Sequence, residues 1–208
     1  MIEAILGALA VAAAEPQKAE PKNDPAKWVR ASDLPRISDD AAVTTFELTI
    51  DETGKAVSCA IIVSSGIDDL DASVCKAVTK RARFEPASNA NGLKVHAARR
   101  DRVIWKPHAV GYNKSYDAAD LIVTLPELQT SKELLVEVLL VVTDSGDTAE
   151  CNVAKSSGDT KLDEFACDAA TSSQVALPIV DGTGQKVAGL RSLFVAFEPG
   201  PTVSVRIR

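Results

Sequence analysis

The sequence has few of the residues that catalytic and metal sites require. Its 208 residues include two histidines, His96 and His108, and neither has an acid or a nucleophile at a spacing typical of a catalytic motif. It has no C-x-x-C pair, although structural zinc sites and thiol redox motifs usually contain one. Ser-Ser-Gly at 64–66 also lacks the G-x-S-x-G pattern of a nucleophile elbow. We therefore expect no enzyme, no metal and no cofactor.

An excess of positive charge is absent as well. The chain has a formal net charge of −6. Nucleic acids and anionic membranes are usually bound by basic surfaces, so neither is an expected partner. No feature of the sequence points to a small-molecule substrate either.

A hydrophobic run long enough to cross a membrane is also missing. The apolar stretch at residues 4–14 would span about 16 Å as a helix, whereas a bilayer core is about 30 Å thick. Ala12 and Ala14 fit the small-x-small pattern of a cleavage site, so we predict a secretory signal peptide at residues 1–14. The segment before the apolar run lacks Lys and Arg, which leaves a packed N-terminal helix as an alternative. Residues 15–27, with three prolines, are predicted to be a linker.

The four cysteines that are present reveal an internal repeat. The separation within each pair is 16 residues, and the second pair follows the first at an offset of 92. A gapless shift of 92 residues also aligns many glycines, prolines and turn residues, which fix the backbone conformation. The aligned positions include Gly54 and Gly146, Ser-Ser-Gly at 64–66 and 156–158, Leu-Asp at 70–71 and 162–163, and Pro86 and Pro178. The chain therefore contains two copies of one backbone.

Each copy has the pattern strand, strand, helix, strand. Apolar and polar residues alternate in the first two segments, which are joined by a turn. Acidic residues then suit the capping of a helix N-terminus, and basic residues suit its C-terminus. The spacing predicts helices near 69–83 and 161–174, and a last strand over 94–105 in the first copy. The expected fold class is α+β, with each helix packed on one face of a small, mainly antiparallel sheet.

The cysteines are predicted to form one disulfide within each copy. Cys59 shares a strand face with apolar neighbours, and Cys75 lies beside the apolar stripe of the helix, so packing would bring the two together. The same argument pairs Cys151 with Cys167. Closing such a loop stabilises a domain by about 3 kcal/mol in the chain-entropy model. Free core cysteines and a zinc site are the alternatives, although zinc usually requires closer pairs.

The first copy resembles the C-terminal domain of TonB over residues 28–107. The similarity begins at Asp33-Leu34-Pro35 and continues through Asp-Glu-Thr-Gly at 51–54, Ser-Ser-Gly and Leu-Asp. It then includes Arg-Ala-Arg-Phe-Glu-Pro-Ala at 81–87 and ends near Trp105. These motifs occur in a fixed order, which makes the combination more specific than any of them alone.

The second copy, at about 130–199, keeps the cysteines, Ser-Ser-Gly and Leu-Asp but lacks the Arg-x-Arg-Phe segment. The resemblance therefore implies two tandem domains of the TonB C-terminal type. Their predicted bounds are 28–109 for domain 1 and 130–208 for a diverged domain 2. An interdomain connection is expected at 110–129.

The resemblance further implies a periplasmic protein that binds others by strand addition, in which a partner segment pairs with an exposed strand. The partner would be an outer-membrane receptor or another component of envelope transport. The family uses a strand in the region 94–105, and this implies a binding edge at Val95, Ala97, Arg99, Val103 and Trp105. The three arginines at 99, 100 and 102 would keep such an edge soluble. The alternative is an energy transducer for receptor-mediated transmembrane transport, anchored in the inner membrane and facing the periplasm.

Overall fold

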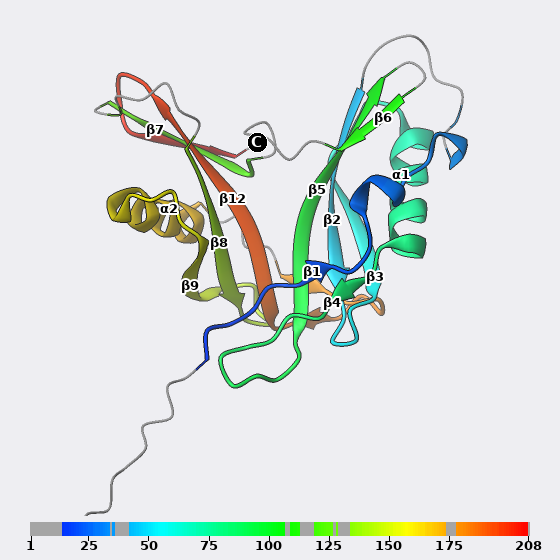
Figure 1. Ribbon diagram of the computed structural model, residues 1–208, viewed down its shortest axis with the longest axis horizontal. Helices are drawn as coiled ribbons and strands as arrows, with labels where there is room; N and C mark the ends of the chain where they lie inside the picture. The colour runs from blue at the N-terminus through cyan, green and yellow to red at the C-terminus, as the bar shows by residue number, and fades with distance from the viewer. Residues whose placement is uncertain are drawn as a thin grey trace, which may run out of the picture.

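The computed structural model describes residues 14–33, 35, 42–106, 109–112, 119–126, 128, 134–173 and 178–207. The predicted signal peptide, apart from Ala14, and His108 lie outside the described residues. The architecture is α+β as expected, with α1 (Asp68–Arg81) and α2 (Thr160–Ser172) packed on a strand-rich sheet (Figure 1). Short 3₁₀ helices lie at Pro25–Lys27 and Ala31–Asp33. The strands are β1 (Glu20–Pro21), β2 (Ala42–Ile50), β3 (Ala56–Val63), β4 (Phe84–Glu85), β5 (His96–Lys106), β6 (Ala109–Tyr112), β7 (Leu121–Leu125), β8 (Leu134–Val142), β9 (Thr148–Lys155), β10 (Ile179–Val180), β11 (Lys186–Val187), β12 (Gly189–Pro199) and β13 (Ser204–Ile207).

One large sheet runs through the molecule in the order β13-β7-β12-β5-β2-β3. In addition, β6 pairs with β5, β8 pairs with β12, and β9 pairs with β8. We call β2, β3, α1, β4 and β5 the first repeat, and β8, β9, α2, β10, β11 and β12 the second repeat. The last strands of the repeats, β5 and β12, pair in parallel over residues 96–99 and 189–192. Beyond this contact they diverge, so the two halves of the sheet open into a V (Figure 1).

The strand pairing of the first repeat recurs in the second at the offset of 92 residues. Thr45 faces Val63 across β2 and β3, and Glu137 faces Lys155 across β8 and β9. Register shifts interrupt the two hairpins at equivalent positions, and β2–β5 and β8–β12 are both antiparallel. Each helix begins and ends within two residues of its predicted bounds. The two repeats thus share their strand order, strand register and helix position.

A left-handed glycine forms the tip of each hairpin. Gly54 has a φ of +84° and Gly146 a φ of +98°, a region in which other residues are strained. A Cβ at Gly54 would lie 2.0 Å from the carbonyl oxygen of Phe84, and one at Gly146 would lie 2.7 Å from Cγ of Pro178. Both turns pack against the segment that follows the helix, so both require glycine for space as well as for φ.

The two hydrophobic cores lie on opposite faces of the sheet. Ala97 belongs to the core under α1, whereas its neighbour Ala98 belongs to the core under α2. Because successive residues of a strand point to opposite faces, the two helices cover opposite sides of the sheet. Leu139 and Leu190 of the second repeat also pack in the core under α1, so the repeats share buried surface.

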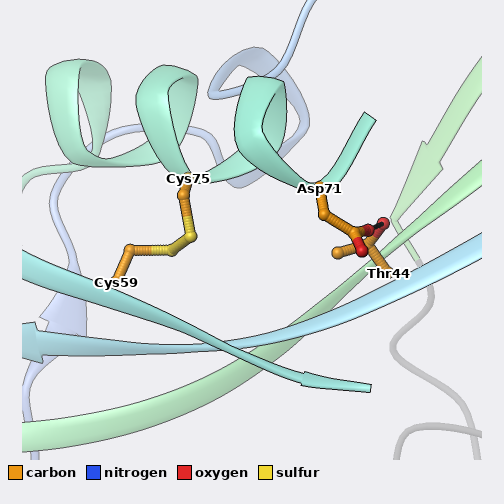
Figure 2. The surroundings of a disulfide bond; sticks show 4 residues. All are labelled: Thr44, Cys59, Asp71 and Cys75. Carbon is orange, nitrogen blue, oxygen red and sulfur yellow. Dashed lines mark hydrogen bonds between the residues drawn. A yellow bond between two sulfur atoms is a disulfide. The ribbon is translucent and has the colours of Figure 1, made fainter. Parts of the chain in front are cut away.

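Asp71 explains why Ser-Ser-Gly and Leu-Asp occur together. Its carboxylate accepts hydrogen bonds from Ser64 Oγ at 2.6 Å and from the Ser65 amide at 3.1 Å. Thr44 Oγ1 donates a third bond at 2.7 Å (Figure 2). Burial opposes ionisation, but these hydrogen bonds together lower the pKa of Asp71 below its usual value. Asp71 therefore fixes the turn between β3 and α1.

The acidic residues expected to cap the first helix, Asp68, Asp69 and Asp71, lie in the first turn of α1, but none of them is its N-cap. The N-cap of α1 is Ile67, and its side chain makes no capping hydrogen bond. In the second repeat Asp163 repeats the turn contacts of Asp71, because it accepts hydrogen bonds from Ser156 and Ser157. Here Asp159 does cap the helix, through the amides of the first turn.

Both predicted disulfides are present. Cys59 of β3 is bonded to Cys75 of α1, with their Cα atoms 5.5 Å apart (Figure 2). Cys151 of β9 is bonded to Cys167 of α2, with their Cα atoms 5.8 Å apart. Each disulfide therefore fastens a helix to the outer strand of its own repeat.

The segment predicted to be a linker, residues 15–27, is packed against the protein. Ala19 is buried, and β1 pairs with β4. An isolated bridge joins Gln17 to Ser88, and Trp28, which directly follows the segment, is fully buried. This segment therefore adds backbone pairing and apolar contacts to the first repeat.

Candidate strand-addition site

The five residues predicted to bind a partner lie on β5 or directly before it, and their side chains face mainly inward. Ala97, Val103 and Trp105 are buried in the core under α1, and Val95 packs against that core. Arg99 forms an ion pair along its own strand. These side chains hold the first repeat together, so a partner could recognise this strand mainly through its backbone.

The backbone of β5 is paired on both sides. β2 pairs with it over residues 97–105, while on the other side β12 pairs with 96–99 and β6 with 103–106. The expectation that this strand forms an exposed edge is therefore wrong. Local sequence cannot reveal a neighbour that comes from a distant part of the chain, and arginine-rich strands also occur inside sheets when the charges are paired. Partner binding by the five residues stays a prediction, and it requires β6 or β12 to separate from β5.

The arginines of the last strands form a buried ionic network between the repeats. Arg100 Nε donates to Glu47 Oε2 at 3.0 Å, and Arg191 Nη2 donates to Glu47 Oε1 at 2.8 Å. The side chains of Arg100 and Arg191 are 5% and 0% exposed. Removing one partner of a buried ion pair costs on the order of 3–5 kcal/mol, because the remaining charge stays buried. Glu47 therefore stabilises the contact between β5 and β12.

Asp120 extends this network to the point where β5 and β12 diverge. Its Oδ2 accepts a hydrogen bond from the Phe194 amide at 2.8 Å, and its Oδ1 lies 3.8 Å from Arg100 Nη1. Arg102 Nη2 donates to the carbonyl oxygen of Ala119 at 3.0 Å. Burial raises the pKa of Asp120 to about 6, although the Phe194 amide and the two arginines act in the opposite direction. A backbone amide and guanidinium groups therefore surround this carboxyl group.

A cavity of about 320 Å³ lies beside the network, where the N-terminal segment crosses between the repeats. Lys18 Nζ contacts the Glu137 carboxylate at 2.5 Å, which ties this segment to β8. Glu20, Arg99 and Lys155 also line the cavity. Cations and anions alternate around it, so the cavity favours no single charge in a ligand.

Short strands from the predicted connection cover equivalent positions on the two last strands. β6 pairs antiparallel with residues 103–106 of β5. β7 pairs in parallel with residues 195–199 of β12. The connection at 110–129 is therefore part of the sheet and does more than join the repeats.

An open strand edge occurs at β13. Among the described strands it pairs with β7 alone, so half of its backbone N–H and C=O groups face away from the sheet. Val203, Val205 and Ile207 are 61%, 45% and 58% exposed. Together with Phe165 of α2 they line a groove of about 420 Å³. A strand added beside β13 would place alternate side chains over this groove, which is the geometry that strand addition requires.

The described part of the chain contains no group of three or more His, Cys, Asp or Glu side chains that could hold a metal ion. Within the same residues no helix is both long and apolar enough to cross a membrane. The described histidine, His96, lies 3.8 Å from the carboxylate of Glu52.

A small sheet with a helix fastened to one face and with open strand edges is typical of protein-interaction domains. Residues 38–107 match the family model described as the Gram-negative bacterial TonB protein C-terminal domain. Over these residues the chain is therefore similar to the TonB C-terminal domain family, whose members are proteins of the Gram-negative envelope. No curated protein and no solved structure is significantly similar to the chain.

Proposed function

We propose that the protein is a periplasmic, non-catalytic partner-binding protein of envelope transport, and that it recognises extended partner segments by strand addition. The match of residues 38–107 to the TonB C-terminal family carries this proposal. The open edge of β13 supports it, because the groove beside that edge can accept apolar side chains of an added strand.

The second repeat is proposed to be a diverged domain of the same type. Its strands pair with the same registers as those of the first repeat, and its helix is fastened by an equivalent disulfide. The packing of residues 15–27 favours a partner-binding protein over an energy transducer, because a transducer needs a segment that is free to extend across the periplasm.

Capture of outer-membrane receptors by the immobilised full chain tests this function. Replacing both Val205 and Ile207 by Lys should reduce the captured amount at least about tenfold, because charged side chains would then line the groove. Val43→Lys is the matched control, since Val43 is 42% exposed on β2, away from the groove. Equal capture by all three proteins would reject the β13 site, and the absence of any captured envelope protein would reject the function.

A further inference from the structure

The edge of β12 that faces the V is already occupied by a segment from outside the repeats. β7 comes from the connection and pairs in parallel with residues 195–199. The position that it fills corresponds to the one that β6 fills on β5, yet β6 runs antiparallel. The same kind of edge thus accepts two different segments in two directions, so its backbone does not require one particular partner.

The side chains of β7 fit this edge closely. Leu121, Val123 and Leu125 are buried in the core under α2. Ile122 points the other way and packs with Ala196. The edge therefore offers apolar contacts on both faces, and the segment that fills it is aliphatic at every position except Thr124, whose Oγ1 donates to Glu198 Oε1 at 3.3 Å.

A polar pocket receives the residue before this aliphatic run. The Asp120 amide donates to the Phe194 carbonyl oxygen at 2.8 Å, and the Phe194 amide donates to the Asp120 carboxylate at 2.8 Å. Arg100 and Arg102 face the same corner, as do the Glu47 carboxylate of β2 and the Arg191 guanidinium of β12. The first position of the bound segment is therefore selected for a short side chain that accepts a hydrogen bond from the Phe194 amide.

We propose that residues 119–125 are an internal strand-addition ligand, which occupies a docking edge on β12. A partner segment with a short hydrogen-bonding polar residue followed by a mainly aliphatic stretch of the length of β7 binds there, parallel to β12, by taking the place of β7. This inference rests on the proposed function. It adds the edge of β12 to the edge of β13 as a site for the same mode of binding, and it names the class of segment that binds at β12.

When a partner segment replaces β7, the contacts that are broken are formed again by the partner. The incoming segment pairs with β12 and β13 as β7 does, so the number of backbone hydrogen bonds is unchanged. The same apolar pockets are refilled. The apparent affinity for a partner is then the intrinsic affinity multiplied by the fraction of time for which β7 is detached from β12. A substitution that weakens the binding of β7 therefore raises the apparent affinity.

A labelled peptide with the sequence of residues 119–126 provides the test, with binding to the full chain measured by fluorescence anisotropy. Val123→Ala, which weakens β7, should bind this peptide about tenfold more tightly than the unchanged protein. Val138→Ala is the matched control, because Val138 is equally buried in the same core but belongs to β8. A peptide in which Leu replaces the residue corresponding to Asp120 should bind more weakly than the original peptide, because Leu cannot accept the hydrogen bond from the Phe194 amide.

Hydrogen exchange gives a second measurement, which is made on the unchanged protein and so does not depend on how a substitution affects folding. Amides of β7 should exchange faster than those of the β8–β12 ladder, because β7 leaves without global unfolding. Equal protection of β7 and β8, or equal peptide binding by the Val123 and Val138 variants, would overturn the inference. If receptor capture through β13 persists in that case, the inference fails while the proposed function stands.

Discussion

Replacing Asp120 by Asn should remove a specific pH dependence from the stability of the protein. Burial raises the pKa of Asp120 from 3.8 to about 6 in the folded state. Between these two values the folded chain holds a proton at this carboxyl group that the unfolded chain has released. Stability therefore rises as the pH falls from about 7 to about 4. One pKa unit corresponds to about 1.4 kcal/mol, so Asp120 contributes a change of about 3 kcal/mol over this range.

Urea unfolding at several pH values under non-reducing conditions measures this contribution. The difference in unfolding free energy between the unchanged protein and Asp120→Asn should change by about 3 kcal/mol between pH 7.5 and pH 4. An amide keeps an acceptor for the Phe194 amide but cannot ionise, so the variant should lack this dependence. A difference that stays constant across the range would refute the argument that Asp120 is buried with a raised pKa.

Asp33 supplies a control of opposite sign. The hydrogen bonds from Arg81, at 2.5 and 2.7 Å, are the main cause that lowers the pKa of Asp33 to about 2. Its contribution is present above its usual pKa of 3.8 and is lost as the pH falls toward 2. Asp33→Asn should therefore lower stability above pH 4 and remove a pH dependence that lies between about pH 4 and pH 2, a range that does not overlap with that of Asp120.

Three further outcomes are expected. Non-reducing peptide mapping should recover Cys59 linked to Cys75, and replacing both by Ser should lower the unfolding free energy by about 3 kcal/mol; a link from either to the second repeat would contradict the structure. Gly54→Ala should destabilise the protein more than Gly92→Ala in thermal unfolding, since both have positive φ but only at Gly54 would a Cβ clash with backbone; equal costs would show that space is not limiting. Fractionation with intact-mass analysis should place the protein in the periplasm without residues 1–14, whereas inner-membrane protein with these residues attached would favour the energy transducer.

The local features of the fold could be predicted because the same sequence pattern occurs in both repeats. The offset between Cys59 and Cys151 aligned the turns, and the alternation and helix spacing then placed both helices within two residues. The disulfide pairs followed from which strand and helix faces carry the cysteines. Each of these inferences depends on residues close together in sequence or on a match between the two copies.

The neighbours of β5 could not be predicted in this way. Pairing with β12 joins residues about 93 positions apart, and no local pattern of residues 94–105 encodes it. Its arginines suggested a solvated edge, yet Arg100 is paired with Glu47 of β2, which lies 53 residues earlier in the chain. One missed element did leave a signal. Leu121–Leu125 reads Leu-Ile-Val-Thr-Leu, which is mainly aliphatic and has no charged residue, the pattern of a strand that is buried on both faces.

The parallel contact of β5 and β12 gives one chain the geometry of a closed dimer. Two equivalent strands that run side by side in parallel, with α1 and α2 on opposite faces, are related by a half-turn about an axis along the strands. An interface of this kind uses the same surface on both units, so it saturates after a single pairing and cannot propagate into a fibre. Fusing the units removes the dependence of that pairing on protein concentration. Among the described strands of the large sheet, β3, β6, β9 and β13 are each paired on one side alone, so further growth of the sheet is restricted to these margins.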